Sequence, residues 1–233
     1  MDKMKSILRA LSIKYDGDFY RTLEALERKE RLDDDEIIIA LSLLGDADYS
    51  STTVIDEDYP QRLRMINIPP IVIYHSGRIA EHDSACIAVV GGLDPSPEVM
   101  KATEILVSQF IEMGHVIVTT SDKGIAEVVR NTCIAENGRC MVILDGGMDM
   151  FDMDSRLTKI SEHPGKVETS DEREVFRNRL VIGLSDRVFI INEDSAERTD
   201  MMTSLAEEQE KNVFVVESRV VTMTHDGTHR KAS

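Results

Sequence analysis

The chain has 233 residues, 42% of them hydrophobic, which is enough for one large α/β domain and a small helical one. Its net charge of −16 excludes a uniformly basic surface, so a polyanionic partner would need a defined basic patch. No apolar run approaches the ~20 residues of a membrane-spanning helix, and the first residues lack the apolar block of a signal peptide.

The first 50 residues predict three helices, because apolar residues recur there at three- and four-residue spacing. The third helix is expected to begin at Asp33, since consecutive carboxylates suit the positive end of a helix dipole. A metal site at these acids is an alternative, which their divergent directions on a helix disfavour. We therefore expect a small N-terminal helical domain over residues 1–50 and a polar linker over 46–58. The apolar positions lie at 7–11, 19–26 and 37–44.

Beyond the linker, short apolar runs alternate with helical stretches. Runs of about four apolar residues are typical of strands buried on both faces of a parallel sheet. Their alternation with helices predicts a Rossmann-like, doubly wound, mostly parallel α/β sheet over residues 58–218, with a tail over 219–233. The predicted strands are 71–74, 87–90, 116–119, 141–144, 188–191 and 213–216, and the clearest helices are 97–112, 125–136 and 196–211.

The loop after residues 87–90 is the first candidate for a ligand site, because ligands of open parallel sheets bind beyond the carboxyl ends of the strands. Gly91 and Gly92 allow close backbone approach, and Ser96 begins a helix whose N-terminus could bind an anion. Asp94 opposes a phosphate there. A plain tight turn is an equally weighted alternative.

Two further loops follow predicted strands. Residues 119–124 combine hydroxyl groups with Lys123 and either hold a phosphate or cap the next helix. Residues 145–149 contain Gly146, which permits close approach, and aspartates, which oppose polyanions. These loops are weaker candidates than a defined phosphate-binding motif.

Arg177 and Arg179 are the remaining candidate cations. Two residues apart on a regular helix, they point about 200° from each other and cannot both face one phosphate. Spacing alone therefore favours ordinary surface arginines paired with the acids at 171, 172 and 174.

The sequence contains no phosphate-loop, metalloprotease or nucleophile-elbow motif, so we expect no catalytic site. The six histidines have no metal-ligand spacing with the cysteines, and no metal or cofactor is expected. Cys86, Cys133 and Cys140 lie in apolar strand or helix patterns, which favours buried thiols and a cytoplasmic protein.

The order of several segments resembles the DNA-processing (DprA/Smf) family. Residues 58–63 and 69–77 look like the start of that family's Rossmann domain, and residues 87–91 stand at its "VAIVGSR" strand and turn. Residues 116–149 align with its central segment without gaps, and residues 177–185 follow its "RNRIISGLS" signature. The resemblance covers about residues 58–217.

This resemblance implies a non-enzymatic protein that binds single-stranded DNA, forms homodimers and loads a RecA-type recombinase during natural transformation. DNA of this kind is bound by an electrostatic groove with base-stacking platforms. The implied contacts are made by cations and by residues that allow the DNA backbone to come close. They are Gly91, Gly92, Lys123, Gly124, Gly146, Arg177, Asn178 and Arg179.

Several departures from the family pattern fall on this pocket. Gly92-Leu93 replaces Ser-Arg and loses a cation, Asp122 is added in the second loop, and Asp145 replaces a glycine. Each lost phosphate contact lowers the salt dependence of binding by about one unit. The chain length also leaves no room for the C-terminal winged-helix domain of some members.

Two alternatives stay open. One is a diverged Rossmann nucleotide-binding sensor or hydrolase that has lost DNA binding, because Asp94 and Asp145 suit a ribose or a metal-bound nucleotide. The other is a regulatory interaction protein without a ligand, whose acidic surface competes for a basic partner.

Overall fold

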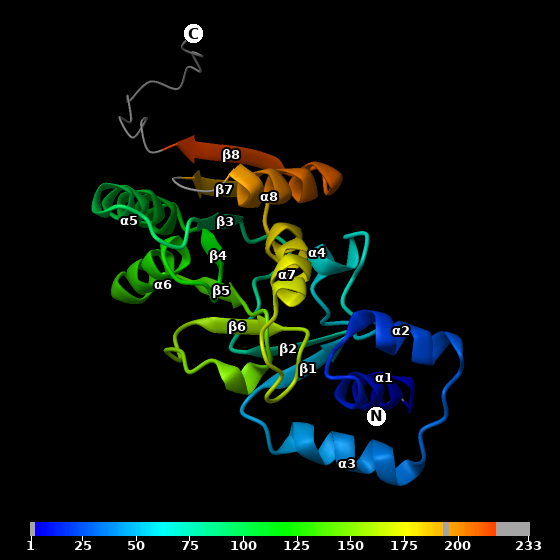
Figure 1. Ribbon diagram of the computed structural model, residues 1–233. Helices are drawn as coiled ribbons and strands as arrows, with labels where there is room; N and C mark the ends of the chain where they lie inside the picture. The colour runs from blue at the N-terminus through cyan, green and yellow to red at the C-terminus, as the bar shows by residue number, and fades with distance from the viewer. Residues whose placement is uncertain (1–2, 193–195, 218–233) are drawn as a thin grey trace.

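An eight-stranded sheet forms the centre of the computed structural model, which describes residues 3–192 and 196–217 (Figure 1). The strand order is β1-β2-β6-β5-β4-β3-β7-β8. The six strands from β6 to β8 in this order pair in parallel, whereas β1 and β2 are antiparallel at one edge. The predicted mostly parallel, Rossmann-like sheet is confirmed. The strands are β1 (Ser50–Thr53), β2 (Val72–Ser76), β3 (Cys86–Gly91), β4 (Val116–Thr120), β5 (Cys140–Ile143), β6 (Thr158–Ser161), β7 (Arg187–Asn192) and β8 (Asn212–Glu217).

Two strands are missing from the sequence-based prediction. β1 lies inside the segment expected as a polar linker, and β6 lies between β2 and β5 in the sheet. Both are short and rich in Ser and Thr, so they carry no apolar run. Their buried hydroxyl groups are satisfied locally: Thr53 donates to Asp56, and Ser161 donates to the carbonyl of Gly146.

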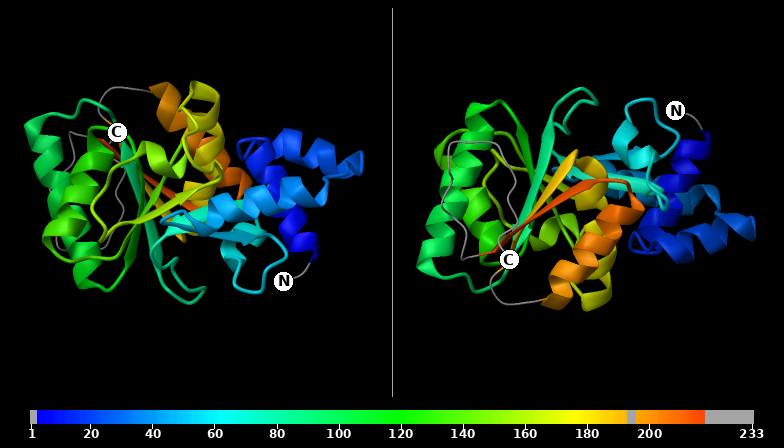
Figure 2. Two further views of the ribbon diagram at one scale, coloured as in Figure 1. Left: turned by 90° about the horizontal axis from the view of Figure 1, so that it is seen from below. Right: turned by 90° about the horizontal axis from the view of Figure 1, so that it is seen from above.

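Helices cover both faces of the sheet, with α5 and α6 on one side and α4, α7 and α8 on the other (Figures 1 and 2). The expected helical segments are confirmed with small shifts at their ends. The helices are α1 (Lys3–Lys14), α2 (Phe19–Glu27), α3 (Asp34–Gly45), α4 (Gln61–Arg64), α5 (Pro97–Glu112), α6 (Ile125–Ala135), α7 (Asp171–Leu184) and α8 (Ala196–Glu208), with a single 3-10 turn η1 (Met148–Met150).

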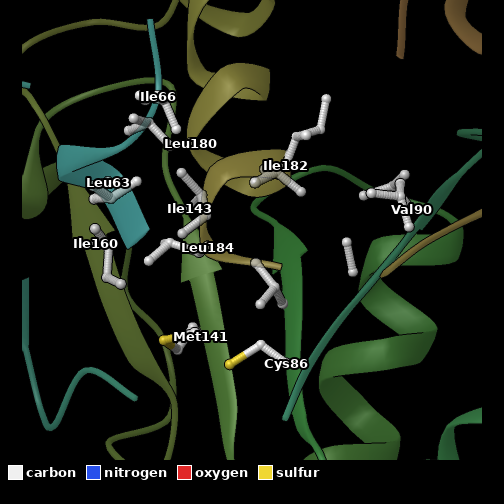
Figure 3. Close-up of a cluster of buried hydrophobic side chains, with 14 of the residues drawn as sticks. Leu63, Ile66, Cys86, Val90, Met141, Ile143, Ile160, Leu180, Ile182 and Leu184 are labelled. Atoms are coloured by element: carbon white, nitrogen blue, oxygen red, sulfur yellow. The ribbon is translucent and has the colours of Figure 1, made fainter. Parts of the chain in front are cut away.

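The strands bury both faces because successive side chains point to opposite sides of the sheet. On β2, Val72 and Tyr74 join the cluster under α5 and α6, while Ile73 joins the cluster under α7. Figure 3 shows this second cluster, in which Leu180 and Leu184 of α7 lie over the sheet. This packing fixes the position of α7, which carries the Arg-Asn-Arg sequence.

The N-terminal helices dock on the antiparallel edge of the sheet. Tyr74 of β2 donates a hydrogen bond of 2.8 Å to Ser12 of α1, and Leu8 joins the core. The expected start of the third helix is confirmed, because Asp33 and Glu36 form a reciprocal capping box. A separate domain over residues 1–50 stays a prediction, and the expected tail over 219–233 lies outside the described residues.

The three cysteines are buried and unpaired, as expected. Burial raises the pKa of Cys86 to about 11. None of the helices in the described ranges is long and apolar enough to span a membrane.

Candidate nucleic-acid interface

A small cavity lies at the carboxyl ends of β3, β4 and β7. The parallel strands extend from β3 in two directions, to β4 on one side and to β7 on the other, which makes this the switch point of the sheet. The cavity has a volume of about 30 Å³, enough for one or two water molecules. Its walls include Gly91, Gly92, Thr120, Asp122, Arg177 and Asn178.

Arg177 reaches this cavity from α7 and is 3% exposed. Its two terminal nitrogens donate to the two carboxylate oxygens of Asp122 over 3.1 and 3.0 Å. Carboxylate oxygens of Asp145 and Glu174 lie 4.0 and 3.9 Å away. Three acids therefore surround one cation, and the interpretation of Arg177 as a surface residue is wrong.

The Nε of Arg177 is buried and has no hydrogen-bond partner among the described residues. A buried donor without a partner is costly, and native structures usually satisfy it with water or a ligand. Arg177 also lines the cavity, which has room for one or two water molecules. The two terminal nitrogens of Arg177 are therefore fixed by hydrogen bonds, and its Nε has no hydrogen-bond partner among the described residues.

The loop that carries Asp122 is held by the protein's own side chains. Thr120 donates to Asp122 over 2.9 Å, and Ser121 donates to Asp145 over 3.0 Å. Arg130 donates to the carbonyls of Thr120 and Asp122 over 2.5 and 2.9 Å, and burial lowers its pKa. This network places Asp122 in position to hold Arg177.

Arg179 lies in a different environment, as the helical spacing predicts. It is 6% exposed and makes two bonds of 2.6 Å to the carboxylate of Glu162. Further bonds go to the carbonyls of Ile68 and Phe176, and the guanidinium lies 3.6 Å from the centre of the Phe176 ring. Arg179 is thus buried and fully paired, and its interpretation as a surface residue is wrong as well.

Three of the four predicted glycines pack against the protein itself. A Cβ at Gly91 would lie 2.3 Å from the carbonyl oxygen of Ile191, and one at Gly146 would lie 2.8 Å from that of Val167. Gly124 has a φ of +66°, and a Cβ there would lie 2.4 Å from the oxygen of Gly92. Gly92 faces open space, since no heavy atom lies within 4 Å of its ideal Cβ position.

Lys123 is exposed and makes no ion pair with the rest of the described chain. Asn178 is 4% exposed and lines the cavity beside Arg177. The structure therefore brings Gly91, Gly92, Arg177 and Asn178 together at one edge, next to the loop of Lys123. Arg179 remains outside this group.

Glu162, the partner of Arg179, escaped the sequence-based prediction because it follows the missed strand β6. Asp122 was visible as an added acid, but its contact with Arg177 joins residues 55 apart in the sequence. Within the described ranges, no group of three or more His, Cys, Asp or Glu side chains could hold a metal ion.

Comparison with known proteins identifies the family. The family described as DNA recombination-mediator protein A matches residues 50–233. Protein Smf of Synechocystis sp. is 27% identical over 175 residues, which cover 68% of this chain and 44% of that protein. DNA processing protein DprA of Streptococcus pneumoniae is 23% identical over 191 residues, covering 78% of this chain and 67% of that protein. This chain thus spans less than half of the Synechocystis relative.

Solved structures show the same fold. The crystal structure of DprA from Streptococcus pneumoniae has a TM-score of 0.71 at 20% identity and covers 94% of this chain and 83% of that one. The DprA of Helicobacter pylori, studied for its single-stranded DNA binding mode, has a TM-score of 0.63 at 22% identity and covers 73% and 81%. The resemblance seen in the ordered sequence segments is confirmed, and the chain belongs to the DNA recombination-mediator protein A family.

Proposed function

We propose that this chain binds single-stranded DNA at the carboxyl edge of its sheet and presents it to a RecA-type recombinase during DNA uptake and recombination. It acts in the cytoplasm as a homodimer. Membership of a family of recombination mediators supports a non-enzymatic role. The observation that carries the proposal is that Arg177, whose buried Nε has no partner among the described residues, lines the cavity at the switch point of the sheet.

The DNA backbone contacts this edge in two ways. Lys123 is exposed beside the cavity and supplies the first phosphate contact. Arg177 donates its free Nε–H to a phosphate oxygen that enters the cavity, while Gly92 leaves room for the approach. Asp122, Asp145 and Glu174 oppose the phosphate, so we expect modest affinity, and two phosphate contacts give only a shallow dependence on salt.

The alternative of a nucleotide site is less well supported. Small-molecule sites usually have volumes of about 300–1,000 Å³, whereas this cavity has about 30 Å³. One oxygen atom fits such a space and a nucleotide does not. The described geometry therefore favours a surface-bound strand over an enclosed nucleotide.

Fluorescence polarisation with a labelled single-stranded oligonucleotide, measured over a salt series, tests the proposal. We expect Lys123→Ala to weaken binding and to reduce the slope of log affinity against log salt by about 0.7. Lys101→Ala removes the same charge from an exposed position on α5 and serves as the control, with no change in slope. Absence of binding by the wild type even at low salt would contradict the proposed function.

A further inference from the structure

Three aromatic rings meet at the surface where α2 lies beside α7. The ring centres of Phe19 and Tyr20 are 5.3 Å apart, and Phe176 lies 6.1 Å from Phe19 and 5.7 Å from Tyr20. Tyr20 is 61% exposed, more than any other aromatic side chain in the described part of the chain. Its side chain is therefore open to solvent while its ring contacts the two others.

Two exposed apolar side chains flank the three rings in the sequences of α2 and α7. Leu23, one turn further along α2, is 37% exposed, and Val175, next to Phe176, is 48% exposed. Single exposed apolar residues are common in proteins, whereas a contiguous group of them indicates a contact surface. This group combines two helices that are far apart in the sequence.

The aromatic cluster is rigid. Phe176 lies on the guanidinium of Arg179, which is fixed in turn by two bonds to Glu162. Tyr20 stands in the first turn of α2, whose N-cap Asp18 accepts a hydrogen bond of 2.9 Å from the Arg21 amide. A ligand that stacks on Tyr20 would therefore lose little free energy in ordering the site.

The cluster and the cavity lie on neighbouring faces of the same helix, because Phe176 and Arg177 are consecutive residues of α7. The first turn of α7 contains Asp171, Glu172 and Glu174, which would repel a phosphate group. A nucleic-acid base carries no negative charge, and all four bases can stack on aromatic rings. The chemistry at this surface therefore suits a base rather than the backbone.

We propose that Tyr20, supported by Phe19 and Phe176, is a stacking platform for an unpaired base of the strand whose backbone lies at the Arg177 cavity. This inference rests on the proposed function and adds a contact from the N-terminal helices. Because Arg177 and Arg179 are both paired with acids, base stacking supplies affinity that does not depend on positive charge.

A single-tryptophan reporter tests the contact directly, since the chain contains no tryptophan. Bases stacked on an indole quench its fluorescence, so we expect quenching when Tyr20→Trp protein is titrated with single-stranded oligo(dT). Met113→Trp is the control, because Met113 is 66% exposed at the opposite, amino edge of the sheet. An unquenched Tyr20→Trp protein with DNA bound would overturn the platform.

Affinity measurements separate the platform from DNA binding as a whole. We expect Tyr20→Leu to weaken binding of oligo(dT) by about 5- to 100-fold, Tyr20→Phe to leave it unchanged, and neither variant to alter binding of an abasic oligonucleotide. Equal losses on both oligonucleotides, or no loss on either, would refute the platform while DNA binding stands. Failure of the wild type to bind either oligonucleotide would overturn the proposed function and the platform together.

Discussion

Two regions of the molecule use an arginine of the same helix in different ways. The carboxyl-edge pocket is formed around Arg177 and Asp122, and the junction with the N-terminal helices is formed around Arg179 and Glu162. Both arginines are buried and bonded to both oxygens of a carboxylate. At the junction, further bonds to two carbonyls and the Phe176 ring complete the environment of the guanidinium.

The carboxyl-edge pocket differs because its arginine has one nitrogen without a hydrogen-bond partner among the described residues. Three carboxylates lie around the single positive charge of Arg177, yet its buried Nε has no partner in the part of the chain that the structure describes. At the junction each nitrogen of the arginine has a partner, and the ion pair stabilises the fold. An arginine with one unpaired nitrogen can also bind a ligand. The two arginines of the Arg-Asn-Arg sequence therefore have different roles.

The largest effect is expected at the junction. Arg179→Ala leaves the buried carboxylate of Glu162 without a partner and should lower the free energy of unfolding by about 3–5 kcal/mol. Urea unfolding measures this, and adding Glu162→Ala should restore part of the loss. Arg28→Ala, which breaks an exposed ion pair with Glu24, serves as the control and should cost less than about 0.5 kcal/mol. A loss below about 1 kcal/mol for Arg179→Ala would show that the junction does not depend on this pair.

A smaller effect is expected at the turn that supports the pocket. Gly124→Ala places a Cβ 2.4 Å from the Gly92 oxygen at a φ of +66°, so either turn must shift. We expect a loss of about 2–3 kcal/mol in unfolding free energy, together with weaker DNA binding. Gly114→Ala is the matched control, because Gly114 also has a positive φ but an ideal Cβ there meets no atom within 4 Å. Equal losses in both variants would show that backbone strain, and not the contact with Gly92, sets the cost.

A separate contact, between α1 and the turn after β1, predicts a dependence on pH. Burial acts to raise the pKa of Asp56, but Lys5, Thr53 and Arg9 outweigh it and hold that pKa well below its usual range. The resulting stability is fully present above about pH 4 and is lost as the pH falls through the lowered pKa. Asp56→Asn should cost about 1–2 kcal/mol at pH 7 and should flatten the decline in stability below pH 4. Acid titrations of the wild type and the Asp56→Asn variant, followed by circular dichroism, measure this decline. The same decline of stability with pH in both proteins would contradict the role of Asp56.

The sequence was most informative where apolar periodicity is strong. The buried strands β3, β4, β5 and β7 could be predicted from their apolar runs. Strands that are covered by helices on both faces consist almost entirely of apolar residues. β1 and β6 could not be predicted because they are rich in Ser and Thr and carry no apolar run. Sheet position, rather than composition, makes these segments strands.

The sequence predicted which segments form the candidate site, but it did not predict the contacts that its side chains make. The glycine turn and part of the Arg-Asn-Arg segment meet at one edge of the sheet, and their role in binding stays a prediction. The pairing of Arg177 with Asp122 and of Arg179 with Glu162 could not be predicted, since each pair joins distant segments. The need for glycine at 91, 124 and 146 also has a source outside the local sequence, namely contacts with the protein's own chain.

In the proposed site, the carboxylate of Asp122 competes with phosphate for Arg177. Asp122→Asn removes the opposing charge while keeping the size of the side chain, so it should raise affinity for a single-stranded oligonucleotide about 3- to 10-fold. Fluorescence polarisation over a salt series should also show a slope steeper by about 0.7 than that of the wild type. Unchanged affinity and slope in a folded Asp122→Asn protein would contradict the claim and assign the pair to structure alone.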